Sequence, residues 1–192
     1  MPPRPGLTKQ IVVDAAVDLI NEDGIEYLSI AALAKRLNIR SPSLYNHIDG
    51  LAGLRRELVL RGLHLLTVDL QAAAMGRAGY DALTEVSKAY RNFARQQPGL
   101  YTLTLRSTEQ GDPELQAVGH AAVAVVLAVL RGYNLDEESA LHAMRCLRSA
   151  LHGFVSLEAA GGFGLPLDLD QSFEQLVNMI DCGLRVQLTN QN

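Results

Sequence analysis

Most of the side chains from Arg40 to His47 can donate hydrogen bonds to nucleic acid. Arginine pairs with guanine or with phosphate, and asparagine can pair with adenine. If Leu44 is buried, the residues left on the outward side of one short helix are Arg40, Ser41, Pro42, Ser43, Tyr45, Asn46 and His47. We therefore expect this segment to contact double-stranded DNA.

Two short helices are needed to present that segment. Ser29 is a suitable N-cap for the first helix, and Asn38 suits the tight turn after it because asparagine tolerates a left-handed backbone. Pro42 favours the first position of the second helix, predicted to run about two turns through His47. Such a pair crosses steeply and can place its second helix in the major groove. The apolar positions that would fix the crossing are Ile30, Ala34, Leu37, Ile39, Leu44 and Ile48.

The rest of the chain also shows helical periodicity. A helix from Lys9 to Asp23, with Thr8 as its N-cap and Gly24 as its end, precedes the pair. Further helices are predicted over residues 50–75, 80–97, 99–107, 113–131, 136–160 and 170–188. The prediction is an all-α fold of about nine helices. Residues 1–50 would form a three-helix helix-turn-helix domain and residues 51–192 a C-terminal helical bundle, with 50–75 as the connecting helix.

Composition and charge are compatible with a DNA-binding protein of 192 residues. Hydrophobic residues make up 48%, enough for a core, and the net charge of −4 is unevenly distributed. Residues 1–56 carry seven basic and six acidic side chains, a net +1, and phosphate affinity depends on such local charge. The N-terminus has no signal-peptide core, and no run approaches 18 uninterrupted apolar residues. We therefore expect a cytoplasmic protein with no membrane partner.

Residues 8–60 resemble the DNA-binding domain of the TetR family of bacterial regulators. The resemblance rests on three stretches: Ile11, Ala15, Ala16, Leu19, Ile20 and Gly24; the run Leu28–Leu37; and the run Ser43–Ile48. In the last run, Ser-Leu-Tyr-x-His following Leu-Ala-x-x-Leu is similar to the family's recognition-helix signature. The resemblance implies phosphate contacts from Ser29, Tyr45 and His47, and base contacts from residues 40–43 and 46.

One position departs from the family's pattern. Members commonly carry a phosphate-binding lysine just inside the fourth helix, but Gly50-Leu51-Ala52 contains none. Arg55 or Arg56 would have to replace it from one turn further along. Beyond residue 60 the resemblance is limited to helix number and length and to Leu151-His152-Gly153-Phe154, which is similar to a His-Gly motif in one group of the family.

The last two predicted helices carry apolar residues at three- and four-residue steps, which favours self-association. Pairing them with their symmetry mates gives a four-helix bundle, and the resemblance points to the same helices. In the alternative, these faces serve only the chain's own core. The predicted dimer-interface residues are Leu147, Leu151, Val155, Phe173, Leu176, Val177, Ile180 and Leu184.

The resemblance also implies a small-molecule effector bound among the middle helices. Arg148 and His152 lie four residues apart beside an apolar face and could hold an anionic or carbonyl-bearing ligand. Each candidate could equally be structural. The side chains expected to project inward are Tyr90, Phe93, Tyr101, His120, Arg148, His152 and Phe154. Ligand binding would change the spacing of two DNA-binding heads through the helix 50–75.

Two other classes of function remain as alternatives. A helical enzyme is disfavoured because the HExxH, GxSxG, Walker and GxGxxG patterns are absent. The five histidines show no metal-ligand spacing, and we expect neither metal nor cofactor. A helical interaction module without a DNA role is the second alternative. The operator, the effector and the choice between repression and activation stay open, repression being the family's default.

Overall fold

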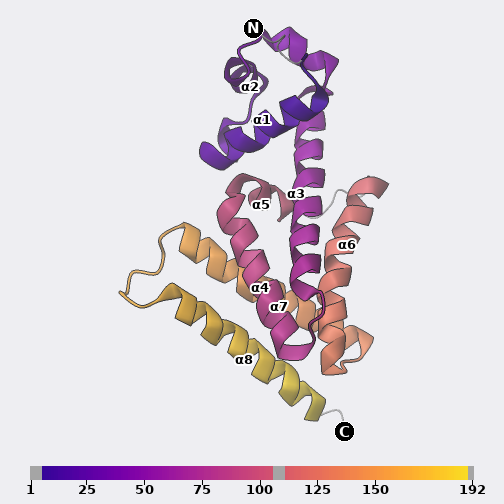
Figure 1. Cartoon of the computed structure of the whole chain (residues 1–192), viewed down its shortest axis with the longest axis vertical. Helices are drawn as coiled ribbons and strands as arrows, with labels where there is room; N and C mark the ends of the chain where they lie inside the picture. Colours follow the sequence, from indigo (N-terminus) through magenta and orange to yellow (C-terminus); the bar gives the residue numbers. More distant parts are fainter. Residues whose placement is uncertain (1–5, 106–110, 190–192) are drawn as a thin grey trace. The chain divides into compact units, whose positions relative to one another are not determined.

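The computed structural model describes residues 6–105 and 111–189, with side chains described up to Val186 (Figure 1). Within these ranges there are eight α-helices, three 3₁₀ helices and no strand, which confirms the predicted all-α fold. In chain order the elements are α1 Lys9–Glu22, η1 Ile25–Tyr27, α2 Ile30–Arg36, η2 Ser41–Asn46, α3 Gly50–Ala74, α4 Gly79–Gln96, α5 Pro98–Thr104, α6 Pro113–Leu130, η3 Arg131–Tyr133, α7 Glu137–Ala159 and α8 Leu169–Thr189.

Side chains cap several helices where the sequence has a residue suited to the role. The Thr8 hydroxyl accepts a hydrogen bond from the Ile11 N–H at 3.2 Å, and the Asp136 carboxylate accepts one from the Ser139 N–H at 2.8 Å. These bonds satisfy N–H groups that have no partner within the helix. Thr8 is therefore the N-cap that the sequence predicts for the first helix. α5 differs from its prediction, because it begins at Pro98 and ends at Thr104.

The chain divides into two compact units. The first consists of the residues up to His64 together with Gln97–Gln116, as far as they are described. The second consists of Leu65–Gln96 and the residues from Ala117 onward. α3 and α6 each begin in the first unit and continue into the second. The predicted functional boundary near residue 50 stays a prediction, because compactness alone does not say which residues contact DNA.

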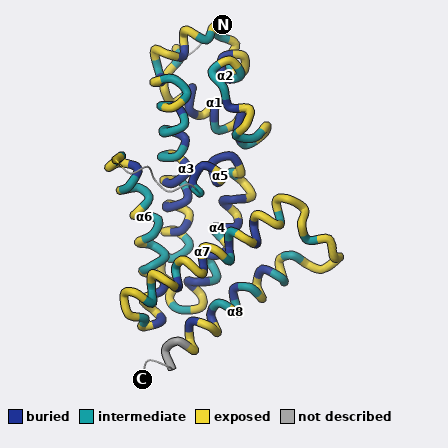
Figure 2. The backbone as a smooth tube through the Cα atoms, turned by 180° about the vertical axis from the view of Figure 1, so that it is seen from behind, coloured by how far each residue is buried: buried dark blue, intermediate teal, exposed yellow. Residues whose placement is uncertain are grey.

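α6 is the most apolar helix of the chain. Together with η3 it spans Pro113–Tyr133 and, by length and composition alone, it is the one described helix that could cross a membrane. Counting only uninterrupted apolar residues did not indicate this, because His120 lies in its middle. Core helices of water-soluble proteins meet the same criterion, so α6 alone assigns no membrane role. Its apolar side chains are largely half-buried, as Figure 2 shows.

In the second unit, α7 and α8 pack on each other and on α4 (Figure 1). Arg91 of α4 joins the three helices from a nearly buried position. Its guanidinium donates two hydrogen bonds to the Glu158 carboxylate, at 2.9 and 2.6 Å, and one to the Asp170 carboxylate at 2.8 Å. The guanidinium carbon also lies 4.8 Å from the ring centre of Phe173 and 5.3 Å from that of Phe154, within cation–π range. We call Arg91, Glu158 and Asp170 the Arg91 clasp.

A second polar contact anchors α8. The Tyr133 hydroxyl donates to the buried Asp181 carboxylate at 2.6 Å, and Arg185 donates to the same carboxylate at 2.7 Å. Burial and the hydrogen bond to Asp181 raise the pKa of Tyr133. Burial alone would raise the pKa of Asp181, but the hydrogen bonds from Arg185 and Tyr133 outweigh it and lower that pKa. Both groups therefore keep their protonation states around neutral pH.

Replacing Glu158 by glutamine tests the Arg91 clasp. The hydrogen bonds from Arg91 lower the pKa of Glu158 from its ordinary value of 4.5, so the clasp stabilises the folded protein above that pH and weakens as pH falls through the lowered pKa. We expect Glu158→Gln to reduce the free energy of unfolding by roughly 1–2 kcal/mol at pH 7. The difference from wild type should shrink below pH 4.5.

Urea unfolding at fixed protein concentration, repeated at several pH values, measures this difference. Glu174→Gln is the matched control, because Glu174 is an exposed carboxylate on α8. A difference between Glu158→Gln and wild type that does not change with pH would contradict the assigned role of the carboxylate charge.

Candidate nucleic-acid interface

The outward face of η2 is set by one buried side chain. Leu44 has no exposed surface, and neither have Leu33, Val12 and Ala16 of the same unit. The element is a 3₁₀ helix over Ser41–Asn46, not the predicted two-turn α-helix through His47. Residues of a 3₁₀ helix repeat every three positions, so the side chains between the buried positions point outward.

Most of the predicted DNA-contacting residues at η2 lie on that outward side. Tyr45 is 59% exposed despite its aromatic ring. Ser41 and His47, three residues before and after Leu44, are half-buried. The exposed members of the set are Arg40, Pro42, Ser43, Tyr45 and Asn46. The structure therefore presents five of the seven predicted residues on one short surface element, whereas Ser41 and His47 lie toward the side of Leu44 and are only partly accessible.

The turn between α2 and η2 depends on Asn38, which has the left-handed φ of 53° that the sequence predicts. Its N–H donates to the Lys35 carbonyl at 3.1 Å, and the next N–H, of Ile39, donates to the Ala34 carbonyl at 3.0 Å. These bonds satisfy carbonyl groups at the end of α2. The direction of η2 relative to α2 is thus fixed by local backbone geometry.

Ser29 combines a structural and a possible binding role. Its Oγ accepts a hydrogen bond from the Ala32 N–H at 3.1 Å, which caps α2. A hydroxyl that accepts one bond still has a proton to donate. The half-buried Ser29 could therefore cap the helix and donate to a phosphate at the same time.

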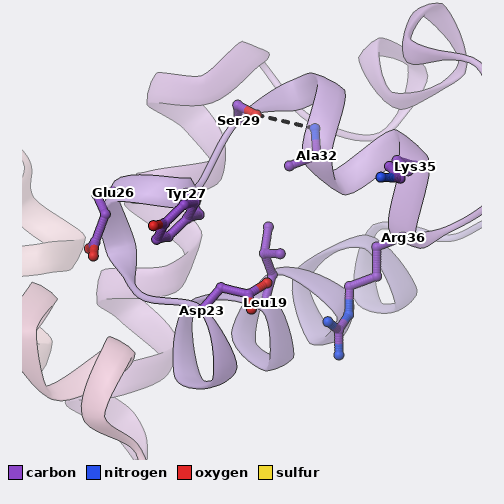
Figure 3. Close-up of a pocket in the computed structure, with 8 residues that line it drawn as sticks. All are labelled: Leu19, Asp23, Glu26, Tyr27, Ser29, Ala32, Lys35 and Arg36. Carbon is purple, nitrogen blue, oxygen red and sulfur yellow. Dashed lines mark hydrogen bonds between the residues drawn. The ribbon is translucent and has the colours of Figure 1, made fainter.

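A groove of about 660 Å³ lies beside Ser29 in the first unit (Figure 3). Figure 3 shows Asp23, Glu26 and Tyr27 toward one end and Lys35 and Arg36 toward the other. Its lining residues are Leu19, Asp23, Glu26, Tyr27, Ser29, Ala32, Lys35 and Arg36. Because acidic and basic groups are equally represented, the groove as a whole is not an anion cradle.

The arginines of the first unit are largely engaged with carboxylates. Arg36 donates two hydrogen bonds to Glu22, both of 2.8 Å. Arg56 donates to both Asp112 oxygens, at 2.6 and 3.1 Å, and to Glu114 at 2.6 Å. These contacts raise the pKa of Arg56 and lower that of Asp112. Of the two suggested replacements for the missing lysine, Arg56 is therefore occupied, and the half-buried Arg55 is the better candidate.

Sequence reasoning left out one exposed cation near this face. Lys35 is exposed on α2 and lines the groove together with Ser29. The sequence shows Lys35 only as one charged residue in a helix. Ser29 and Lys35 lie at opposite ends of α2 (Figure 3), and the groove that both line depends on how α1, η1 and α2 fold together.

The predicted effector residues are not brought into one described site. Tyr90, Phe93 and Phe154 are buried in the second unit, whereas the buried Tyr101 belongs to the first. His152 is half-buried, with 3.3 Å between its Nδ1 and the Ser156 Oγ. The expectation that all seven side chains project inward is wrong for His120 and Arg148, which lie on the exposed sides of α6 and α7. The periodicity of the sequence identified the two helices, but it did not show which side of each helix these two residues face. The effector role of the seven residues stays a prediction.

The predicted dimer-interface residues lie mostly inside a single chain. Six of them are buried there, namely Leu147, Leu151, Val155, Phe173, Val177 and Leu184. Leu176 and Ile180 are half-buried. Because these six side chains are buried by their own chain, they offer no exposed surface to a partner in this conformation. The sequence did not reveal this, since an apolar stripe looks the same whether its own chain or a second chain covers it. The exposed apolar side chains of the same two helices are Leu141, Leu157, Met179 and Val186.

The sequence matches two family models that together cover most of the chain. Residues 12–50 match the model described as bacterial regulatory proteins of the tetR family. Residues 83–180 match the model described as the tetracyclin repressor-like C-terminal domain. The first model includes the whole of α2 and η2.

Individual proteins show the same similarity. The HTH-type transcriptional regulator YobS of Bacillus subtilis is 36% identical over 99% of both chains. The HTH-type transcriptional regulator Rv0681 of Mycobacterium tuberculosis is 37% identical over 96% of this chain and 84% of its own. Among solved structures, regulatory protein SCO4313 has a TM-score of 0.74 at 26% identity, with 90% of this chain and 94% of that chain covered. ActR of Streptomyces coelicolor, solved in complex with (S)-DNPA, has a TM-score of 0.65 at 18% identity, with 96% of this chain and 100% of that chain covered.

Substituting Ser29 by aspartate separates its two roles. Aspartate is as good an N-cap as serine, so the unfolding free energy should change by less than about 0.5 kcal/mol. A carboxylate beside a phosphate is repelled, so affinity for duplex DNA should fall at least about tenfold. Thermal unfolding and fluorescence anisotropy with labelled DNA measure the two effects. Ser29→Asn, which keeps the cap without adding charge, is the control. Unchanged DNA affinity in Ser29→Asp would show that Ser29 is a cap only.

Proposed function

Because this chain belongs to the tetR family of bacterial regulatory proteins, we propose that it represses transcription as a homodimer bound to a palindromic operator and is released by a small-molecule effector. That it is a DNA-binding regulator follows from the family. The observation that best supports the proposed mode of binding is the outward face of η2, where Tyr45, Asn46 and Ser43 are exposed while Leu44 is buried.

We assign the residues of the proposed DNA-binding face to base contacts or to phosphate contacts according to their side-chain chemistry. Asn46 and Arg40 are suited to base edges in the major groove, since amide and guanidinium groups match the hydrogen-bonding patterns of adenine and guanine. Tyr45, His47 and Ser29 would donate to phosphates and fix the position of the element on the duplex. Arg55 and Lys35 would add long-range attraction that does not depend on sequence. The protein would act in the cytoplasm, where the chromosomal DNA lies.

Dimerisation supplies the length of DNA that one short element cannot read. Two symmetric heads about 34–36 Å apart would occupy successive major grooves on one side of a palindrome. The exposed sides of α7 and α8 are the proposed contact surface. Met179 and Val186, seven residues apart, share the exposed side of α8, whereas Leu141 and Leu157 are exposed on opposite flanks of the buried side of α7. Exposed residues of both helices are yellow in Figure 2. Such a surface, used by both copies, gives an isologous four-helix arrangement.

An effector would act by binding one conformation of the dimer more tightly than the other. ActR, which shares this fold, was solved in complex with (S)-DNPA. In this chain the buried aromatic side chains Tyr90, Phe93 and Phe154 of the second unit are the proposed apolar part of an effector site. We propose neither a catalytic activity nor a cofactor, because members of this family act by binding.

Selection of DNA from random or genomic fragments at about 150 mM salt tests the regulator proposal, since specific binding persists where non-specific binding weakens. We expect wild type to recover one short palindrome. Tyr45→Ala should weaken that binding by at least about tenfold and leave thermal stability nearly unchanged, because the ring is 59% exposed. Tyr80→Ala is the control, with a tyrosine 37% exposed on α4, outside the unit that carries η2.

Protein that has been unfolded and refolded without ligand should be tested in parallel, so that a co-purified effector cannot mask binding. Failure of both preparations to recover specific DNA would count against the repressor and would favour a helical interaction module.

Introducing a charge on the proposed dimer surface tests the oligomer. Met179→Glu places an unpaired carboxylate in an apolar contact, and we expect it to raise the dimer dissociation constant by about 100-fold or more. Met75→Glu is the matched control, because Met75 is 76% exposed and Met179 is 64% exposed. Sedimentation velocity over a dilution series measures both variants. Equal dissociation constants for Met179→Glu and wild type would exclude this part of α8 from the interface.

A further inference from the structure

A segment far from the N-terminus in sequence belongs to the same compact unit as the DNA-binding face. Residues Gln97–Gln116, which contain α5 and the start of α6, cluster with the residues up to His64. The family model places the same segment in the C-terminal domain, as does the sequence-based division at residue 50. The compact unit that carries η2 therefore combines two stretches of the chain that are far apart in sequence, and within it α5 packs against α1.

One side chain of α1 makes the polar part of this contact. Asn21 accepts a hydrogen bond from the Gly99 N–H at 3.0 Å through its Oδ1. Its Nδ2 donates to the Gln97 Oε1 at 2.7 Å. The Gly99 N–H lies in the first turn of α5 and has no carbonyl partner within its own helix. A single half-buried amide thus joins the end of α1 to the beginning of α5.

The backbones approach so closely at this point that only glycine fits. A Cβ on Gly99 would lie 2.4 Å from the carbonyl oxygen of Ile20 and 2.5 Å from its carbonyl carbon. These are backbone atoms of α1, so a side chain could be accommodated only by moving a helix. α5 itself is almost wholly buried, and Leu100 has no exposed surface. Packing and hydrogen bonds together make the contact stiff.

α3 is tied to the same segment at two places. A Cβ on Gly62 would lie 2.9 Å from the Thr104 Cγ2 and 3.4 Å from Leu100. At the other place, Arg56 holds Asp112, whose carboxylate also accepts hydrogen bonds from the N–H groups at the start of α6. The segment therefore contacts both α1 and α3 within the first unit.

We propose that α5 and the beginning of α6 help to orient the DNA-binding face, and that Asn21 is the positioning residue through which α5 orients α1 and, with it, η2. The chain enters the segment directly from α4, which belongs to the second unit, and leaves it through α6, which continues into that unit. A displacement of either helix would then reach the head through Asn21 as well as along α3. This inference rests on the proposed operator function.

Asn21→Ala tests the proposal. If Asn21 orients the head, the variant should bind the recovered palindrome about tenfold more weakly, because both heads must fit at once. Its affinity for a single half-site, measured at low salt, should change less than about twofold. Hydrogen exchange of residues 97–104 should be faster than in wild type, because the joint is loosened. Gln10→Ala is the matched control, since Gln10 is an amide on α1 bonded only within that helix, to Asp14.

Asn21→Asp provides a second route in case the alanine variant is unstable. The carboxylate keeps the acceptor for Gly99 and loses the donor to Gln97, so palindrome binding should weaken. Adding Gln97→Lys should restore binding to within about twofold by replacing the amide contact with an ion pair. Rescue by this partner is not expected from a residue that contributes only general stability.

The outcomes separate the two proposals. Palindrome binding equal to wild type, an equal loss on palindrome and half-site, or unchanged hydrogen exchange would each overturn the role of Asn21. A wild-type protein that binds no palindrome would count against the operator function, and hydrogen exchange would still decide whether Asn21 joins α1 to α5.

Discussion

The burial of Leu44 is the constraint on which the functional surface depends. This side chain has no exposed area, and burying an apolar group of this size contributes about 2 kcal/mol. Rotating η2 to bury Tyr45 or Asn46 instead would expose Leu44 and desolvate polar groups. The core of the first unit therefore fixes which side of η2 faces solvent. Recognition residues can differ in chemistry while this single apolar position keeps their orientation.

Intramolecular ion pairs determine how much positive charge remains for DNA. Arg36 and Arg56 are both held by carboxylates in the first unit, so they contribute less to phosphate attraction than their number suggests. Arg91 in the second unit is committed to Glu158 and Asp170 and connects α4, α7 and α8. The positive charge of the proposed DNA-binding face is therefore small and local, in a chain whose net charge is −4.

The helices of the second unit illustrate two uses of one apolar pattern. The inner sides of α7 and α8 are covered by the same chain and held by the Arg91 clasp, whereas Met179 and Val186 are exposed on the outer side of α8. A rigid pair of helices is a suitable platform for a partner, because little conformational entropy is lost when it associates. The Arg91 clasp thus holds together the same two helices that carry the proposed dimer surface.

The sequence by itself determined the features that depend on neighbouring residues: the helical periodicity, the caps at Thr8 and Ser29, the left-handed Asn38 and the polar face around Leu44. These follow from local backbone and hydrogen-bonding preferences. Only the tertiary structure decided that η2 is a 3₁₀ helix, that Leu147 and Phe173 are covered by their own chain, and that α5 packs on α1. Gly99 shows the reason. In the sequence it follows Pro98 and marks a break, but in the fold it admits the backbone of Ile20, a contact between residues 79 positions apart that no local preference encodes.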